Sequence, residues 1–217
     1  MEADMPDLKN RMNTQFREIE EFQDLYLLQE KDIDAAANCN ADAYMDYELL
    51  KQILQDKFDY DILRKLWTIS IKSLKNEALF VADSPQLKGF SIWAPAGFKG
   101  SKIIPFFKAG GLTLPIPILM RLERYEQYSM KLKKKYTGHN GWYLYDLVVR
   151  RDCQNHGIAK KILNPVLDYI ERSGQSCYLE THNTANVDIY RKFGFELIET
   201  GNVPGLNIRH YAMLKRI

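Results

Sequence analysis

Cysteine is scarce in this chain of 217 residues, which has three in all: Cys39, Cys153 and Cys177. An odd number of cysteines without the spacing of a metal site argues against a disulfide framework and against a cysteine-bound zinc ion. Free thiols persist in reducing compartments. The sequence therefore predicts three free thiols and a cytoplasmic protein.

Histidine is scarce as well, and the four histidines do not occur at the spacing of metal ligands: His139, His156, His182 and His210. A single histidine is more often a surface or hydrogen-bonded residue than a ligand. The sequence therefore predicts no metal site.

The chain also lacks a strong excess of one charge and a long apolar run. Thirty basic residues against 28 acidic ones give a net charge of +2, which demands neither nucleic acid nor an anionic membrane as partner. The first residues lack the apolar core of a signal peptide, and the apolar stretch 102–120 is interrupted by Lys108, two glycines and three prolines. We expect neither a nucleic-acid nor a membrane partner.

Apolar residues are abundant enough for a core. They make up 46% of the sequence, which suits a single domain over residues 1–217. Apolar residues at helical spacing from Leu8 to Ile19 predict an accessory helix over 6–22. Over 95–140 the composition shifts to glycine, proline and bulky apolar residues, and we interpret this stretch as an insertion that contains a helix at 116–135.

The rest of the chain alternates strands and helices. A strand at 25–29, two or three helices within 32–75 and strands at 78–82 and 88–94 are expected first. After the insertion come a strand at 142–149, a helix at 157–172, a strand at 177–180, a helix at 185–193, and strands at 195–200 and 206–214. This order predicts an α/β fold. Because strand 142–149 is almost continuously apolar, we expect it at the centre of the sheet.

A turn with one glycine joins that central strand to the next helix. The segment Gln154 to Ala159 follows the strand, and Gly157 stands where the helix begins. Such a junction directs unpaired backbone N–H groups and a helix dipole at one point, where a pyrophosphate binds. It is neither a Walker A loop nor a dinucleotide fingerprint. By itself the turn is equally compatible with an ordinary strand–helix connection.

A second group of polar residues follows the next strand. Glu180 ends that strand, Asn183 and Asn186 follow it, Tyr190 lies on the next short helix and Gly194 is placed to end this helix. Ligands of open α/β sheets bind beyond the carboxyl ends of the strands. We therefore expect the Glu180 carboxylate and the Tyr190 hydroxyl to face one cleft.

The two segments together resemble the core motifs of the GNAT superfamily of N-acetyltransferases. They read Q-x-x-G-x-A from Gln154 to Ala159 and L-E-T-x-N-x-x-N-x-x-x-Y-x-x-x-G-F from Leu179 to Phe195. Further short segments of the C-terminal half are similar to the puromycin N-acetyltransferase branch. The sequence departs from the family at Asn155-His156, where Arg or Gly is usual, and at Ala159, where a second Gly is usual.

The resemblance implies a mixed, mostly antiparallel sheet of about seven strands flanked by helices, with a splay between strands 142–149 and 177–180. It also implies acetyl-CoA as co-substrate, with the pantetheine arm along the backbone of 147–149. The basic residues beside the turn suit a 3′-phosphorylated nucleotide: Arg150, Arg151, Lys160 and Lys161. The residues implied to bind the cofactor are Leu147, Val148, Val149, Gln154, Asn155, His156, Gly157, Ile158, Ala159, Lys160, Asn183, Asn186 and Tyr190.

Three residues are candidates for catalysis. Tyr190 matches the family's general acid, with a buried structural aromatic as the alternative. Glu180 is the first choice as base, because ribosomal-protein N-acetyltransferases of this superfamily carry a catalytic Glu at the equivalent strand end. Asp146 competes with it, since apolar neighbours raise a carboxyl pKa, and a chain of waters is the third alternative.

The leading functional prediction is transfer of an acetyl group to a primary amine of a small molecule, by a monomer or a homodimer. Seven aromatic residues are candidates for the acceptor pocket: Phe98, Phe106, Phe107, Tyr125, Tyr128, Tyr136 and Trp142. The alternatives are a protein lysine or N-terminal acetyltransferase and a non-catalytic acyl-CoA-binding module.

Overall fold

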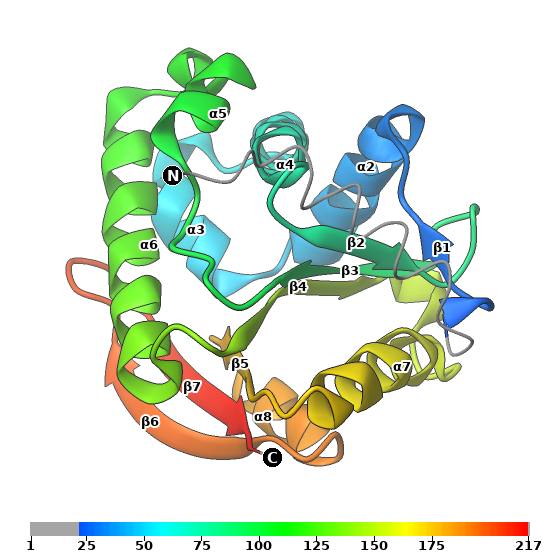
Figure 1. Ribbon diagram of the computed structural model, residues 1–217. Helices are drawn as coiled ribbons and strands as arrows, with labels where there is room; N and C mark the ends of the chain where they lie inside the picture. The colour runs from blue at the N-terminus through cyan, green and yellow to red at the C-terminus, as the bar shows by residue number, and fades with distance from the viewer. Residues whose placement is uncertain (1–21, 217) are drawn as a thin grey trace, which may run out of the picture.

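A seven-stranded sheet forms the centre of the protein, with helices on both of its faces (Figure 1). The computed structural model describes residues 22–216, and the strand order is β1-β2-β3-β4-β5-β7-β6. The accessory helix predicted over 6–22 lies outside the described residues except for its last residue, Phe22, and stays a prediction.

The elements follow the predicted order. The strands are β1 Tyr26–Leu27, β2 Leu79–Ala82, β3 Gly89–Ala94, β4 Trp142–Val149, β5 Cys177–Thr181, β6 Glu196–Asn202 and β7 Arg209–Lys215. The helices of the described residues are α2 Ile33–Tyr44, α3 Glu48–Leu54, α4 Tyr60–Leu74, α5 Ile103–Lys108, α6 Ile116–Thr137, α7 Ile158–Arg172 and α8 Thr184–Arg191. The stretch interpreted as an insertion forms α5 and α6 between the neighbouring strands β3 and β4.

The sheet is mixed and mostly antiparallel, which confirms the predicted fold class. Five of its six neighbouring pairs are antiparallel, and the sixth, β4 with β5, is parallel. β4 is the fourth of the seven strands. Its near-continuous apolar sequence is therefore covered on both faces, as expected for a central strand.

β4 and β5 separate soon after they begin. Their pairing is limited to Trp142 with Cys177 and Tyr143 with Tyr178. On the other edge of β4, the register against β3 shifts so that Tyr145 has no partner, which is a β-bulge. A bulge bends its strand and increases its twist. The predicted splay is confirmed, and it leaves the β5-facing edge of β4 open beyond Tyr143.

Two apolar layers hold the sheet between helices. On one face, α2 and α4 pack against Tyr143 and Val148 of β4. On the other, α7 packs against Trp142 and Leu144 of the same strand, with Val187 of α8 nearby. Figure 1 shows α2 and α4 above the sheet and α7 below it. The helical periodicity of the sequence provides one apolar side for each of these helices.

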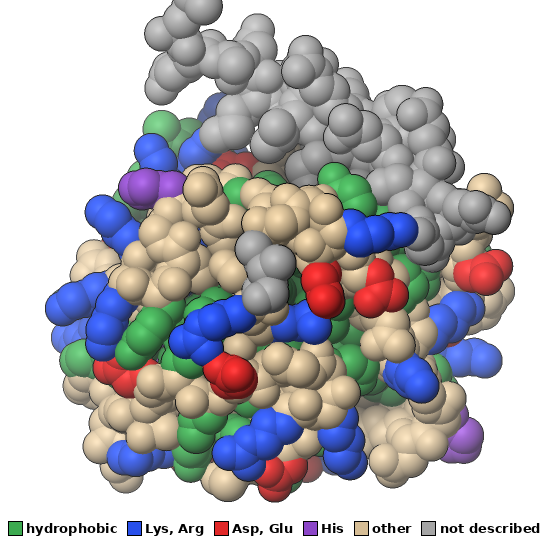
Figure 2. Space-filling model, turned by 60° about the horizontal axis from the view of Figure 1, so that its bottom comes forward, with side chains coloured by type: hydrophobic (Ala, Val, Ile, Leu, Met, Phe, Trp, Pro, Cys, Tyr) green, Lys and Arg blue, Asp and Glu red, His purple; other side chains and the backbone are tan. Residues whose placement is uncertain are grey.

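The surface mixes charges of both signs. Figure 2 shows one face of the molecule, on which Lys and Arg side chains lie among Asp and Glu side chains and are not gathered into one patch. Within residues 22–216, no helix combines the length and the apolar character needed to cross a bilayer.

Candidate active site

A cavity of about 990 Å³ lies where β4 and β5 separate. Its walls come from α2 to α6, from β4, from the end of β5 and from α8. Asp146, Glu180 and Tyr190, the three catalytic candidates, all line it. The fold therefore brings together residues from three separate elements at one cavity.

Asp146 is buried at the bulged part of β4, with a side chain held by two donors from α2. The Asn40 amide donates to Oδ2 at 2.9 Å, and the Tyr44 hydroxyl donates to Oδ1. Burial raises the pKa of Asp146 from 3.8 to about 6, although both hydrogen bonds oppose the rise. Asp146 thus links α2 to the central strand and titrates near neutral pH.

The raised pKa of Asp146 predicts that the stability of the folded state depends on pH. The folded chain binds more protons than the unfolded chain between pH 3.8 and about 6, so the folded state loses stability as the pH rises through this window. Asp146→Asn removes the titration. We compare the free energy of unfolding of the variant with that of the natural protein. We expect this difference to shift in favour of the variant by roughly 2–3 kcal/mol as the pH rises from 4 to 7.5. Urea unfolding of both proteins at pH 4 and at pH 7.5 measures this shift. An equal difference between the two proteins at the two pH values would contradict the prediction.

Glu180 lies near the end of β5 among tyrosines. Its Oε1 accepts hydrogen bonds from the Tyr143 hydroxyl and, at 3.1 Å, from the Tyr125 hydroxyl. Burial raises the pKa of Tyr178, and the nearby Glu180 carboxylate raises it further. The Tyr178 hydroxyl itself makes no hydrogen bond within residues 22–216. Oε2 is buried and has no hydrogen-bond partner within residues 22–216. One oxygen of this carboxylate is therefore held by two hydroxyls, and the other keeps its acceptor capacity unused among the described residues.

Tyr190 lies on α8, where it packs in the core and also lines the cavity. Its ring packs against Phe195 at a centroid distance of 6.0 Å, within the apolar layer beneath the sheet. Burial raises the pKa of Tyr190 well above its ordinary value, so its phenol stays protonated at neutral pH. Tyr190 is therefore a packed aromatic that also lines the cavity, and its role as general acid stays a prediction.

The residues predicted to bind the cofactor divide into two sets. Those that line the cavity are Leu147, Val148, Val149, Gln154, Asn183, Asn186 and Tyr190. Those that lie outside its lining, on the surface turn and the start of α7, are Asn155, His156, Gly157, Ile158, Ala159 and Lys160. The set is thus spread from the open edge of β4 to the N-terminus of α7.

The predicted phosphate turn ends in a bare helix N-terminus. Gly157 is the N-cap of α7 with φ of +79°, a left-handed conformation that favours glycine. No side chain of residues 22–216 caps this helix end. A Cβ at Gly157 would find no atom of the described residues within 4 Å. The first turn of α7 therefore lacks a side-chain cap among the described residues and has open space beside Gly157, as an anion site requires.

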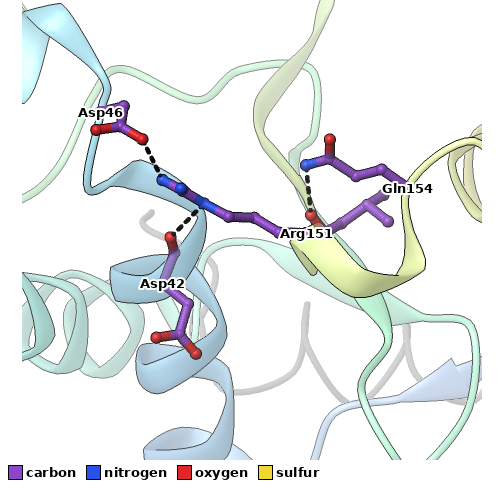
Figure 3. A network of polar contacts seen from close by, with 5 residues as sticks. Asp42, Asp46, Arg151 and Gln154 are labelled. Carbon is purple, nitrogen blue, oxygen red and sulfur yellow. Dashed lines mark hydrogen bonds and ion pairs between the residues drawn. The ribbon is translucent and has the colours of Figure 1, made fainter.

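The side chains beside this turn are largely engaged within the protein (Figure 3). Arg151 donates to the Asp46 carboxylate at 2.7 Å and to the Asp42 carbonyl at 3.1 Å, which ties the turn to the end of α2. The Gln154 amide donates to the Val149 carbonyl at 3.2 Å. Arg150 pairs with Asp152, and Lys161 donates to the Asp83 carbonyl. Of the four basic residues expected beside the nucleotide, Lys160 is the one without such a contact among residues 22–216.

The two asparagines after β5 have different roles. Asn183 is the N-cap of α8, and its Oδ1 accepts a hydrogen bond from the Ala185 N–H at 3.0 Å. Asn186 donates to the Thr181 hydroxyl at 3.2 Å. The cap of α8 is thus supplied by Asn183, and both side chains line the cavity.

A buried histidine pair lies beside the cavity. His182 Nε2 and His210 Nδ1 are 3.1 Å apart, and the Tyr47 hydroxyl lies 3.3 Å from His182 Nδ1. Burial and the neighbouring His210 lower the pKa of His182 from 6.5 to about 3, so its ring is neutral at the cavity wall. Within residues 22–216 no group of three or more His, Cys, Asp or Glu side chains is placed to hold a metal ion.

Part of the aromatic lining of the cavity was predicted from the sequence. Of the seven predicted residues, Phe106, Phe107 and Tyr125 line the cavity, whereas Phe98, Tyr128, Tyr136 and Trp142 do not. The aromatic lining residues that were missed are Tyr44, Tyr47, Trp67, Tyr143 and Tyr145. Tyr143 and Tyr145 lie two positions apart on the predicted central strand, so the sequence could have indicated that they share one face of it. The residues on α2 and α4 had none, because their approach to β4 is a tertiary contact.

Comparisons with known proteins agree with this geometry. Residues 124–195 match the model of the acetyltransferase (GNAT) family. A Corynebacterium glutamicum structure described as histone acetyltransferase HPA2 and related acetyltransferase is 16% identical, with 88% of this chain and 94% of that chain covered, at a TM-score of 0.59. Mosquito arylalkylamine N-acetyltransferase like 5b is 13% identical, with 89% and 99% covered, at a TM-score of 0.56.

A third structure contains a cofactor. The PaiA N-acetyltransferase from Thermoplasma acidophilum, in complex with coenzyme A, is 14% identical, with 89% of this chain and 98% of that chain covered, at a TM-score of 0.50. At such identities the likeness concerns the fold, and the resemblance to the puromycin N-acetyltransferase branch stays a prediction. This chain therefore has the fold of GNAT acetyltransferases, and its residues 124–195 carry the sequence pattern of that family.

Proposed function

We propose that this protein is an acetyl-CoA-dependent N-acetyltransferase that acts on a primary amine of a small molecule. The observation that carries the proposal is the cavity at the β4–β5 splay, where Glu180 and Tyr190 from the family-like segment meet the open edge of β4. An acyl transfer to an amine requires a base, an acid and donors for the carbonyl oxygen. The residues at this cavity can provide each of them.

The chain's residues fit acetyl-CoA at two places. Beyond Tyr143 the backbone of β4 has no strand partner on its β5 side among residues 22–216, so its N–H and C=O groups can pair with the amides of a pantetheine arm. At the far end, the bare N-terminus of α7 beside Gly157 can receive the pyrophosphate. The coenzyme A complex of the Thermoplasma acidophilum neighbour supports this co-substrate.

In the proposed reaction Glu180 accepts a proton from the ammonium of the acceptor, whose ordinary pKa is about 10. The neutral nitrogen attacks the thioester carbonyl, and a backbone N–H of β4 stabilises the oxyanion. When the C–N bond has formed and the C–S bond breaks, Tyr190 gives its proton to the sulfur. The second proton of the attacking nitrogen then restores the Tyr190 phenol, and Glu180 releases the first proton to solvent, so that the amide and free CoA thiol are the products. The unpartnered Glu180 Oε2 is the reason for preferring Glu180 to Asp146, since both oxygens of Asp146 already accept hydrogen bonds.

Release of free thiol tests the proposal directly. Purified protein is mixed with acetyl-CoA and a panel of small amines, lysine peptides and N-terminal peptides, and calorimetry measures acetyl-CoA binding separately. We expect binding and thiol release with small amines. Release with peptides alone would favour a protein acetyltransferase. Binding without any release would indicate a non-catalytic acyl-CoA-binding module, and no binding would refute the proposal altogether.

A glycine substitution tests the phosphate site. Gly157→Ala places a methyl group in the open space above the helix and keeps an unfavourable left-handed residue, which costs about 1 kcal/mol of stability. We expect acetyl-CoA affinity to fall about tenfold. Gly174→Ala is the matched control, because Gly174 has φ of +66° with equally open surroundings. Equal acetyl-CoA affinity of the two variants in calorimetry would place the pyrophosphate elsewhere.

A further inference from the structure

The charges that line the cavity restrict what can enter it. Three carboxylates that line it are not exposed, Glu126, Asp146 and Glu180, and burial raises the pKa of Glu126 as well as that of Asp146. Among the lining residues that belong to 22–216, Arg124 is the single Lys or Arg, and its side chain is exposed. An additional carboxylate or phosphate on the acceptor would meet these like charges, and within residues 22–216 the cavity offers it the exposed Arg124 and no buried cation.

The wall nearest these carboxylates is aromatic and uncharged. Tyr44 stacks on Trp67 with ring centroids 5.2 Å apart and an interplanar angle of 18°, and Tyr47 meets Tyr44 edge to face at 5.0 Å. Tyr125 continues the wall against His182, with centroids 5.4 Å apart. Such rings bind apolar and aromatic groups, and their faces attract cations.

The rim of the cavity is apolar as well. Ile103 of α5 and Met120 of α6 line it while 63% and 60% exposed. Three further exposed apolar side chains lie on the same two helices and the turn between them: Ile104, Leu112 and Ile116. Of these five side chains, Ile103 and Met120 line the cavity, and exposed apolar groups beside a ligand cavity indicate a contact surface for the ligand.

From these observations we infer the class of acceptor: a primary amine carried on an uncharged aromatic body, without any acidic group. Its ammonium lies against the buried carboxylates, its ring lies along the Tyr44–Trp67 wall, and its distal end reaches the rim at Ile103 and Met120. This inference rests on the proposed function, because the acceptor is taken to share the cavity in which the acetyl group is transferred.

Matched acceptors test the inference. Tryptamine and tryptophan differ by one carboxylate, and tryptamine and ethylamine differ by the indole ring. With acetyl-CoA in the thiol-release assay, we expect kcat/KM for tryptamine to exceed the value for either other amine by at least about 100-fold. In calorimetry on the protein saturated with CoA, we expect tryptamine to bind and tryptophan not to bind.

Matched variants locate the contact surface. Ile103 and Ile104 are both 63% exposed, but Ile103 lines the cavity and Ile104 does not. Ile103→Ala should raise the KM for tryptamine several-fold with little change in kcat, because only apolar contact is removed. Ile104→Ala should leave both constants unchanged. Glu126→Gln should reduce the preference for tryptamine over tryptophan by about tenfold, since one buried like charge is lost.

The outcomes separate this inference from the proposed function. If tryptophan or ethylamine is acetylated as efficiently as tryptamine, or if Ile103→Ala and Ile104→Ala behave alike, the acceptor class is wrong although the enzyme stands. If tryptamine binds selectively to the CoA-saturated protein and no amine releases thiol, the acceptor class holds and the proposed activity fails.

Discussion

Glu180→Gln should lower kcat/KM for amine acetylation by about 10²- to 10⁴-fold, the usual contribution of a general base. The amide keeps the volume of the carboxylate, and its oxygen can still accept from the Tyr125 and Tyr143 hydroxyls, so we expect the fold to persist. Acetyl-CoA affinity should stay within about twofold, because the base contacts the amine. Thiol release and calorimetry measure the two effects separately.

Asp146→Asn is the comparison that decides the identity of the base. It also removes a buried carboxylate at the same cavity, but one whose two oxygens already accept from Asn40 and Tyr44. We expect its kcat/KM to fall much less than that of Glu180→Gln. The reverse order would transfer the role of base to Asp146, whose pKa of about 6 suits proton transfer near neutral pH. Small losses in both variants would favour a chain of waters.

Tyr190→Phe should lower kcat by about 100-fold while acetyl-CoA binds almost as before. The phenol of Tyr190 stays protonated because burial raises its pKa, and the phenylalanine ring keeps the packing against Phe195. The leaving sulfur then departs without a proton donor. Single-turnover thiol release measures the chemical step, and the melting temperature checks that the core is unchanged.

Tyr211→Phe is the matched control for this substitution. Tyr211 belongs to the same apolar layer as Tyr190, and its hydroxyl lies 3.0 Å from the Thr184 hydroxyl on the same helix. It does not line the cavity. We expect its turnover to equal that of the natural protein. Equal turnover of Tyr190→Phe and the natural protein would leave Tyr190 a structural aromatic only.

Helices and strands were predictable where the local sequence pattern matched the burial of the element in the folded protein. β4 has the predicted bounds because apolar side chains on both faces suit a central strand. α7 fills the predicted range and continues through Pro165, with Ile162, Val166 and Ile170 buried along it. β7 begins at Arg209, later than predicted, because Leu206 and Ile208 pack in the apolar cluster of α3, α4 and α6 and not in the sheet.

The irregular features were not predictable, because they depend on neighbouring strands. The bulge at Tyr145 exists only in the register of β4 against β3, and no local pattern marks it. It shifts the alternation of β4, so that Asp146 turns toward Asn40 and Tyr44 of α2, more than 100 positions earlier in the chain. The hydroxyls around Glu180 likewise come from α6 and β4.

Local patterns along the chain were enough to predict the order of the elements, the glycine turn at Gln154 to Ala159 and the polar segment after β5. These features are local, since helical and strand periodicity, glycine at a helix start and the spacing of Glu180 and Tyr190 are properties of short segments. Which side chains share the cavity depends on long-range packing, which no local pattern reveals. Register, the bulge and the approach of α2 and α4 place aromatic residues from distant positions against β4, and packing of the whole chain selects these contacts.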